Sequence, residues 1–246
     1  MNYLSEVGKF SIFIMKVFSK PEKIQLSFRE LREELIKLGI NSIAIVVIIS
    51  FFIGAVLTLQ TAYNIRTPLV PTYLVGYLVR ESMLLEFSST IVSLILAGKI
   101  GSNIASEIGT MRITEQIDAL ELMGINSVSY LVAPKIIAAM LINPVLYIFS
   151  VFIGIIGGAL AGHIGGSVNI VNFVQGLQYN LTFYYITYSI IKTVFFGFVI
   201  TAIPAYYGYY VSGGALDVGK ASTKAVVNSS VAVLILNLVL TQLLLK

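Results

Sequence analysis

Five long apolar segments constrain the fold of this chain more than any other feature. They run approximately from Ile40 to Tyr63, Leu69 to Ala97, Tyr130 to Ala161, Phe183 to Tyr210 and Ala225 to Leu245. A helix needs about 20 predominantly apolar residues to cross the hydrocarbon core of a bilayer, whereas the strands of a membrane barrel are short and alternate in polarity. The sequence therefore predicts an all-α polytopic membrane protein with five transmembrane helices.

The composition supports this class and excludes several others. The mean hydropathy is +0.90, and only 11% of the residues are charged, which is too apolar for an ordinary soluble domain. The chain has no Cys, so disulfides, thiolate nucleophiles and Cys-based metal sites are excluded. Lys9 and Lys16 interrupt the N-terminal apolar residues, so we do not expect a cleavable signal peptide.

Lysine and arginine residues are distributed unequally between the two ends of the predicted helices. One side carries Lys9, Lys16, Lys20, Lys23, Arg29, Arg32, Lys37, Lys99, Arg112, Lys135, Lys220 and Lys224, and the other carries Arg66 and Lys246. The positive-inside rule predicts a cytoplasmic N-terminus and, after five crossings, a C-terminus outside the cytoplasm. The net charge of +4 then reflects this sidedness and attraction to anionic lipids rather than nucleic-acid binding.

The first 39 residues are predicted to form amphipathic helices. One apolar face comprises Tyr3, Val7, Phe10, Ile14 and Val17. After Pro21, Ser27 and Glu30 match a capping box that opens a second helix, with Phe28, Leu31, Leu35 and Leu38 as its apolar stripe. These helices either lie in the membrane interface or pack on the cytoplasmic side of the bundle. We therefore divide the chain into an interfacial region, residues 1–39, and a five-helix domain, residues 40–246.

Catalytic and cofactor sites are not expected. The single histidine, His163, has no acidic residue near it in sequence. The segment from Gly214 to Ala221 approaches the G-x-x-x-x-G-K-[ST] pattern, but Ala221 replaces the hydroxyl that binds Mg²⁺, and the flanking apolar helices leave no place for a preceding strand. The chain should therefore hold no ATP, cofactor or metal itself.

Small and charged residues within the apolar segments predict contacts inside the membrane. Gly154, Gly158, Gly162 and Gly166 follow a small-xxx-small repeat that permits close helix packing, either within one chain or between two. Four intramembrane charges require a partner or a polar cavity: Arg80, Glu81, Glu86 and Lys192. Adjacent residues of a helix point about 100° apart, so Arg80 and Glu81 are not expected to satisfy each other. Pairing within the bundle, a cavity for a headgroup and a proton relay all remain open.

A polar passage separates the second and third apolar segments. It is predicted to form a short helix from Thr110 to Met123 that ends at Gly124. Its carboxylates Glu115, Asp118 and Glu121 suit a docking surface on the cytoplasmic side.

Several motifs resemble those of one known family. They are the run from Glu107 to Gly124 followed by Pro134, Ala97 to Ser102, Gly54 to Gln60, Ile191 to Gly197, and Gly213 to Val227. Together they are similar to the MlaE permease family, the membrane subunits of ATP-binding cassette transporters that move phospholipids and related lipids, over roughly residues 30–245. The chain departs from the pattern in two places. Ser82, Met83 and Leu84 stand where the family usually has Leu-Gly-Pro, which puts the expected bend in doubt, and Asn237 stands where many members have Asp.

The resemblance implies the partners and the location. The implied assembly is a homodimer of permeases with two cytoplasmic ATPase subunits, which bind the ATP, and an external lipid carrier with an MCE domain. The implied location is the inner membrane of a bacterium, with the C-terminus in the periplasm. A bundle of five helices is too small to enclose a two-tailed lipid, whereas a symmetric pair can form a cavity on its two-fold axis. The passage at about 107–124 corresponds to the coupling helix of the family, with Glu107, Arg112, Glu115 and Asp118 as ATPase contacts.

The resemblance and the burial argument together indicate a lipid site between the first and second apolar segments. Its candidate contacts are Leu57, Gln60, Asn64, Tyr77, Arg80 and Glu81. An alternative is an ion-coupled secondary transporter or channel, which could also use the intramembrane charges Glu86 and Lys192. A lipid-modifying enzyme would need a convergent set of catalytic groups, and the isolated His163 argues against it.

Overall fold

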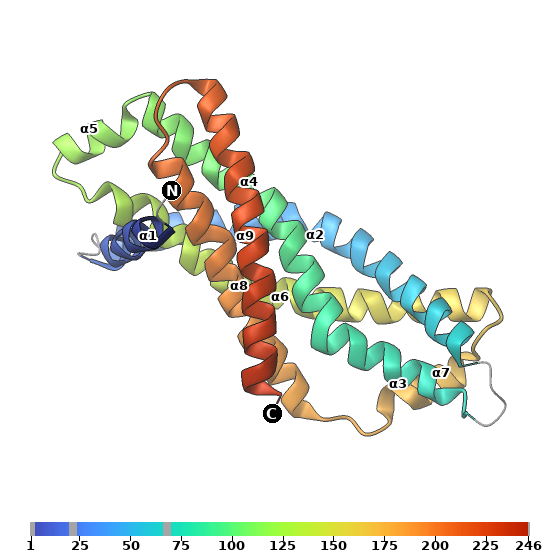
Figure 1. The fold of residues 1–246 in the computed structure, drawn as a ribbon. Helices are drawn as coiled ribbons and strands as arrows, with labels where there is room; N and C mark the ends of the chain where they lie inside the picture. Colours follow the sequence, from blue (N-terminus) through green and yellow to red (C-terminus); the bar gives the residue numbers. More distant parts are fainter. Residues whose placement is uncertain (1–2, 20–23, 66–69, 246) are drawn as a thin grey trace.

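The computed structural model describes residues 3–19, 24–65 and 70–245, and side chains from Glu6 to Ser19 and from Arg29 onward within these ranges. Its regular elements are helices (Figure 1): α1 Tyr3–Phe18, α2 Ile24–Asn64, α3 Tyr73–Ser82, the π-helix η1 Met83–Ile91, α4 Val92–Ile113, α5 Gln116–Leu122, α6 Ser127–Ile164, α7 Ile170–Gln178, α8 Phe183–Tyr209 and α9 Ala215–Leu244. Five helical segments in the described ranges are long and apolar enough to cross a membrane. The predicted all-α polytopic class is confirmed.

Helix α2 is longer than its apolar segment. Its 41 residues span about 60 Å at 1.5 Å per residue, about twice the thickness of a hydrocarbon core. The prediction that a separate helix starts at Ser27 is wrong, because α2 begins at Ile24 and continues past residue 39 without a break. The side chains of Tyr3, Ser27 and Phe28, and the predicted charges Lys20, Lys23, Arg66 and Lys246, lie outside the described residues.

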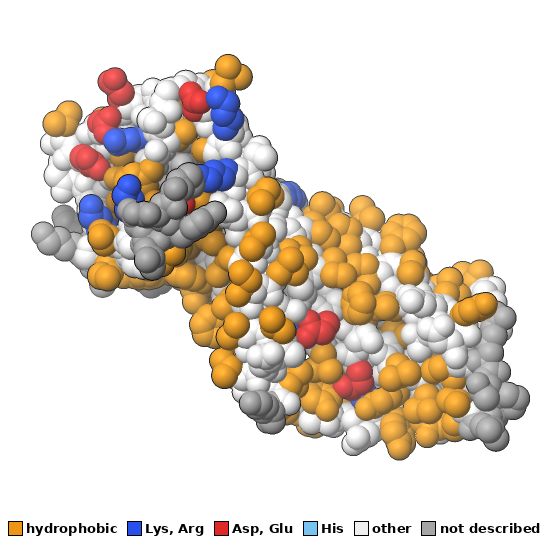
Figure 2. All heavy atoms as spheres, viewed as in Figure 1, with side chains coloured by type: hydrophobic (Ala, Val, Ile, Leu, Met, Phe, Trp, Pro, Cys, Tyr) orange, Lys and Arg blue, Asp and Glu red, His pale blue; other side chains and the backbone are white. Residues whose placement is uncertain are grey.

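The helices form two packed groups (Figure 1). Helix α2 runs along α6, helices α4, α8 and α9 pack together, and α6 joins the groups through its contact with α8. Helices α1 and α5 lie at one end of the molecule, and α3 and α7 lie at the other. Charged side chains gather at the end that carries α1 and α5, whereas hydrophobic side chains cover most of the remaining visible surface (Figure 2).

The contact between α2 and α6 depends on glycine. A Cβ atom at Gly54 would overlap the backbone of Gly154, and a Cβ atom at Gly157 would overlap the backbone of Phe51. The predicted glycine repeat therefore packs within one chain, where the absence of side chains lets the two backbones approach closely. Gly166 is not part of this contact, because it follows the helix and has a left-handed φ of 62°.

Helix α1 packs on the bundle through one of its faces. Phe13 and Val17 are fully buried, and the Phe13 ring lies 5.6 Å from that of Tyr209 on α8. Val7 of the predicted apolar face does not share this contact, because it is 62% exposed. An apolar second face therefore stays open, and it consists of Val7, Ile12, Met15 and Phe18.

A π-helix, η1, occupies the part of the second span that includes Met83 and Leu84, where the bend implied by the resemblance was in doubt. Backbone carbonyl groups in η1 accept hydrogen bonds from side chains of neighbouring helices: Leu84 O accepts from Tyr147 Oη at 3.1 Å and from Ser189 Oγ at 2.6 Å, and Leu85 O accepts from Lys192 Nζ at 3.1 Å. Such π segments are rare and interrupt the regular helical hydrogen bonds. The second span thus departs from regular α-helix without proline.

Candidate functional site

An ion pair lies inside the bundle between η1 and α8. Lys192 Nζ is 3.0 Å from Glu86 Oε1, and the Lys192 side chain is fully buried. Lys192 also donates to the hydroxyl of Tyr188 at 2.9 Å. A buried ammonium group is costly unless it is paired and hydrogen-bonded, so these partners explain how the lysine is accommodated. The structure therefore brings together two of the four predicted intramembrane charges, Glu86 and Lys192.

Polar side chains complete this cluster from η1 and α9. Asn237 Nδ2 donates to Glu86 Oε2 at 3.0 Å, and Thr90 Oγ1 donates to the same oxygen at 3.2 Å. Thr241 Oγ1 donates to Glu86 Oε1 at 3.3 Å. Asn237 thus contributes a neutral donor to the Glu86 carboxylate. The Glu86 side chain remains 39% exposed, and Figure 2 shows acidic side chains among hydrophobic ones away from the charged end.

Arg80 connects α3 by hydrogen bonds to the end of α7 and the connection between α7 and α8. Its Nη1 donates to Leu177 O at 2.6 Å and to Tyr179 O at 2.9 Å, and its Nη2 donates to Asn180 O at 3.4 Å. The expectation that Arg80 and Glu81 do not satisfy each other is wrong, because Arg80 Nη2 lies 2.5 Å from Glu81 Oε1. The long arginine side chain compensates for the divergent directions of neighbouring residues on a helix.

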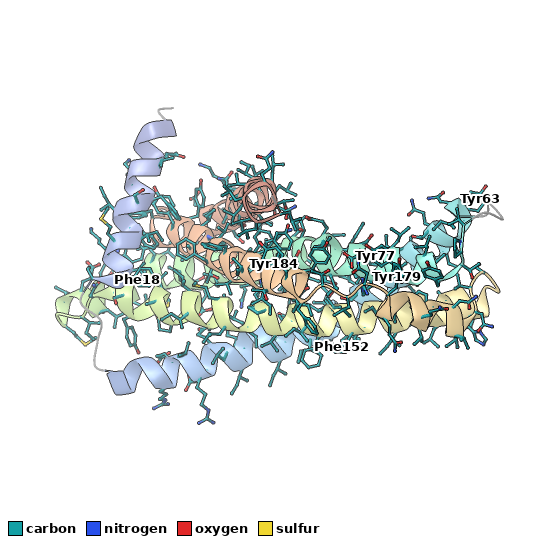
Figure 3. The ribbon with its side chains drawn as sticks, turned by 90° about the horizontal axis from the view of Figure 1, so that it is seen from below. Phe18, Tyr63, Tyr77, Phe152, Tyr179 and Tyr184 are labelled. Atoms are coloured by element: carbon teal, nitrogen blue, oxygen red, sulfur yellow. The ribbon has the colours of Figure 1, made fainter. Side chains whose placement is uncertain are left out.

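Two tyrosine rings lie close to these Arg80 hydrogen bonds. The rings of Tyr77 and Tyr179 meet edge to face at 5.7 Å, and Figure 3 shows them side by side where α3 and α7 approach each other. The Arg80 guanidinium lies 5.1 Å from the Tyr77 ring centroid. Glycine allows the two short helices to pack so closely, since a Cβ atom at Gly176 would overlap the backbone of Tyr73.

The predicted lipid contacts do not all lie together. A cavity of about 270 Å³ is lined by Arg80 together with residues of η1, α6, α7 and α8, not by α2. Leu57 is partly buried against the core that contains Val75 and Val79, and Gln60 and Asn64 are exposed on α2. Within the described chain, the cavity that includes Arg80 therefore lies between the second, third and fourth spans rather than between the first and second. The roles of these residues stay predictions.

The polar passage contains a turn that the sequence analysis missed. Helix α4 continues to Ile113, and Glu115 adopts a left-handed φ of 60° before α5 begins at Gln116. The prediction of one helix from Thr110 to Met123 is therefore wrong. Its end is confirmed, because Gly124 has φ 79° and Ile125 N donates to Leu120 O at 3.1 Å, a hydrogen-bonding pattern typical of a glycine C-cap.

The predicted ATPase contacts occupy two different environments. Glu115 is exposed at the turn, and Asp118 pairs with Arg112 at 2.7 Å while half of its side chain remains exposed. Glu107 lies further inside, where it pairs with Lys37 of α2 at 2.5 Å and with Lys135 of α6 at 2.9 Å.

Lys135 extends these ion pairs to α2. It is buried and also pairs with Glu34. Glu34, Lys37, Glu107 and Lys135 therefore form a charge network that connects α2, α4 and α6. The sequence patterns indicated no site role for Glu34, Lys37 and Lys135. Their positions at the ends of apolar segments were the available signal, but the pairing depends on tertiary structure.

Glu121 anchors α5 to the bundle. Its Oε1 accepts hydrogen bonds from Tyr209 Oη at 2.8 Å and from Ser127 Oγ at 2.9 Å. These donors stabilise the charged form, so they lower the pKa of the Glu121 carboxyl below its usual value. Among the described residues, no group of three His, Asp or Glu side chains could hold a metal ion. The Glu121 hydrogen bonds thus connect α5 to α6 and α8.

Comparison with known proteins agrees with this architecture. The sequence profile described as Permease MlaE matches residues 31–243. A probable ABC transporter permease protein of Rickettsia bellii is 38% identical over 245 residues, covering 98% of this chain and 92% of the relative. The intermembrane phospholipid transport system permease protein MlaE of Haemophilus influenzae is 32% identical, covering 98% and 97%. Protein TRIGALACTOSYLDIACYLGLYCEROL 1 of Arabidopsis thaliana is 31% identical, covering 89% and 62%. The chain therefore belongs to the MlaE permease family.

Proposed function

We propose that this chain is the membrane subunit of an ATP-binding cassette transporter that moves phospholipid or a related lipid between the inner membrane and an external MCE-domain carrier. The Haemophilus influenzae relative is named as a phospholipid transport permease, and the family profile covers most of the chain. The observation that carries the proposal is the α4–α5 turn. It presents Glu115 and Asp118 at the charged end of a bundle that has no nucleotide-binding motif of its own.

The proposed assembly contains two copies of the chain and two cytoplasmic ATPase subunits, which bind the ATP. The end with α1 and α5 faces the cytoplasm, and the C-terminus faces the periplasm. The concentration of charged side chains at the first of these ends supports this orientation (Figure 2), as the positive-inside rule requires. Helix α9 presents an apolar face that is open to lipid or to a second copy, including Leu234, Ile235 and Leu238.

Force would pass from the ATPase to the spans through rigid contacts. Closure of the ATPase pair would move α5, which Glu121 ties to α6 and α8 through Ser127 and Tyr209. The charge network at Glu107 would carry the movement to α2 and α6. The ATPase can shift the equilibrium only if it binds one conformation of the bundle better than the other. Lipid would then exchange between the membrane and the carrier.

Charge reversal at the α4–α5 turn tests this function. The variant with Glu115→Lys and Asp118→Lys should lose copurification with the ATPase but still insert into the membrane. A matched variant with Glu115→Gln and Asp118→Asn also breaks the Arg112 pair without reversing the charge, so it should lose less. Retention of the full complex by the reversed variant would remove the coupling assignment.

Lipid transfer separates the transporter from its main alternative. Native purification followed by mass spectrometry should identify a nucleotide-hydrolysing subunit, and proteoliposomes containing the complex should transfer lipid only with ATP. The half-exposed Glu86 beside Lys192 is the observation that favours an ion-coupled transporter. Transport driven by a proton gradient without any ATPase would support that second function instead.

A further inference from the structure

The cavity beside Arg80 has walls that are almost entirely apolar. Its volume is about 270 Å³, and its walls include Leu84 of η1, Val151 and Ile155 of α6, and Ile186 of α8. All four residues belong to helices that are long and apolar enough to cross a membrane. Among the residues that the structure describes, Arg80 is the only charged one in the wall of this cavity.

The Arg80 guanidinium is not available to an anionic ligand. A guanidinium group has five N–H donors, and Arg80 forms five hydrogen bonds. Its Nε and Nη2 donate to Glu81, and the remaining donors contact Leu177 O, Tyr179 O and Asn180 O. Only 3% of its side chain is exposed. Arg80 therefore closes the wall, and the cavity offers no free charge to a headgroup phosphate.

The size of the cavity restricts its occupant to a thin molecule. Ordinary small-molecule sites measure about 300–1,000 Å³, so this cavity is too small for a complete two-tailed lipid. A protein helix is about 10 Å wide with its side chains and does not fit inside either. The cavity reaches the surface of the bundle at Phe152, which lines it and is 65% exposed, and this side chain projects outward from α6 (Figure 3). In a bilayer, the thin apolar molecules at this position are lipid tails.

We propose that this cavity binds one acyl chain of a membrane lipid. Tyr147 lines the cavity and also donates to Leu84 O of the π-helix. A bound chain therefore contacts a residue that supports the irregular part of the second span. The use of this site to hold a tail during transport rests on the proposed function, whereas the binding itself does not.

Tryptophan fluorescence tests the proposal directly, because the chain contains no Trp. Phe152→Trp places a single reporter at the mouth of the cavity. Leu141→Trp places one on the same helix, about 16 Å away along its axis, at an exposed position that does not line the cavity. The full-length protein in detergent is titrated with a phosphatidylcholine brominated on its acyl chains. Quenching of Phe152→Trp should saturate at about one lipid per chain, and quenching of Leu141→Trp should rise without saturation.

A variant whose larger side chain occupies the cavity tests whether the saturable quenching arises there. In the Phe152→Trp protein, Val151→Phe should occupy the cavity and remove the saturable quenching, whereas Ile156→Phe, at an exposed position outside the cavity, should leave it unchanged. Native mass spectrometry of the same variants should show the loss of one retained lipid only with Val151→Phe, provided that circular dichroism shows both variants to be folded.

Two results would overturn the proposal. One is quenching of Phe152→Trp that rises without saturation like that of Leu141→Trp. The other is Phe152→Trp fluorescence that the brominated lipid does not quench, because the reporter would then lie away from any bound acyl chain. Neither result depends on an ATPase, so this inference can fail while the proposed transport function stands.

Discussion

Gly54 of α2 and Gly154 of α6 face each other so closely that a Cβ atom on Gly54 would overlap the Gly154 carbonyl group. Association of helices in a membrane depends on such close packing, because lipid tails are as apolar as the helices themselves. This contact holds the first and third spans together within one chain.

We expect Gly54→Ala to destabilise the bundle. The added methyl group must push two backbones apart, at a cost of about 1–3 kcal/mol. Thermal unfolding of the purified protein in detergent measures the effect. Gly98→Ala is the matched control, because a Cβ atom there meets no neighbouring atom, and an unchanged Gly54→Ala protein would contradict the packing.

Arg80→Leu should destabilise the protein and should also reduce any lipid transport. The substitution leaves the carbonyl groups of Leu177 and Tyr179 without their donor and leaves Glu81 without its cation. Gln60→Leu, at an exposed position on α2, should keep the stability of the original protein and reduce lipid transfer only if Gln60 contacts lipid. Limited proteolysis of the α7–α8 connection measures the first effect, and a lipid transfer assay measures the second. If proteolysis of Arg80→Leu is unaltered, Arg80 does not hold this connection in place.

Removal of one partner from the Glu86–Lys192 pair should cost more than removal of both. Glu86→Gln leaves the fully buried Lys192 ammonium without a counter-ion, and such losses cost about 3–5 kcal/mol when both partners are buried. We expect the lower part of this range, because Glu86 is partly exposed. The double variant with Glu86→Gln and Lys192→Met should recover part of the loss. A double-mutant cycle of unfolding free energies checks this prediction. If the losses of the two single variants simply add in the double variant, the prediction is wrong.

Asn237→Asp should be unfavourable in this chain. Asn237 donates to Glu86 Oε2 at 3.0 Å, so an aspartate would replace a donor by a second negative charge, at a cost of about 1–3 kcal/mol. The same substitution should be tolerated when Glu86 is also changed to Gln, because Lys192 then has one carboxylate nearby. Unfolding temperatures of the single and double variants provide the measurement, and a stable Asn237→Asp single variant would argue against the observed contact.

The stabilising effect of Glu121 should depend on pH. Hydrogen bonds from Tyr209 and Ser127 lower its pKa in the folded protein, so its contribution is complete above the unfolded pKa of about 4.3 and is lost as the pH falls through the folded pKa. Wild-type protein should therefore be more stable than Glu121→Gln at pH 7, by less than about 1.5 kcal/mol because the carboxylate is exposed. The difference should shrink as the pH falls below about 4.3, and a difference that stays constant as the pH falls would exclude this cause.

The sequence alone determined the features that depend on local composition. The five apolar segments identified the membrane-crossing helices because length and hydropathy are sufficient for this assignment. Gly124 ended α5 because a left-handed residue is easiest for glycine. The motifs between Gly54 and Val227 were sufficient for the family, since they preserve both residue type and spacing.

Only the tertiary structure decided the relationships between distant residues. Glu86 meets Lys192 and Asn237 across sequence separations of more than 100 residues, and no local pattern selects those partners. The pairing of Arg80 with Glu81 was wrongly excluded because helical direction was considered without the reach of the arginine side chain. Glu107 joins a network with Lys37 and Lys135 because α2, α4 and α6 converge there. Helical periodicity predicts which face of a helix is apolar, but the contacts of that face depend on how the helices pack.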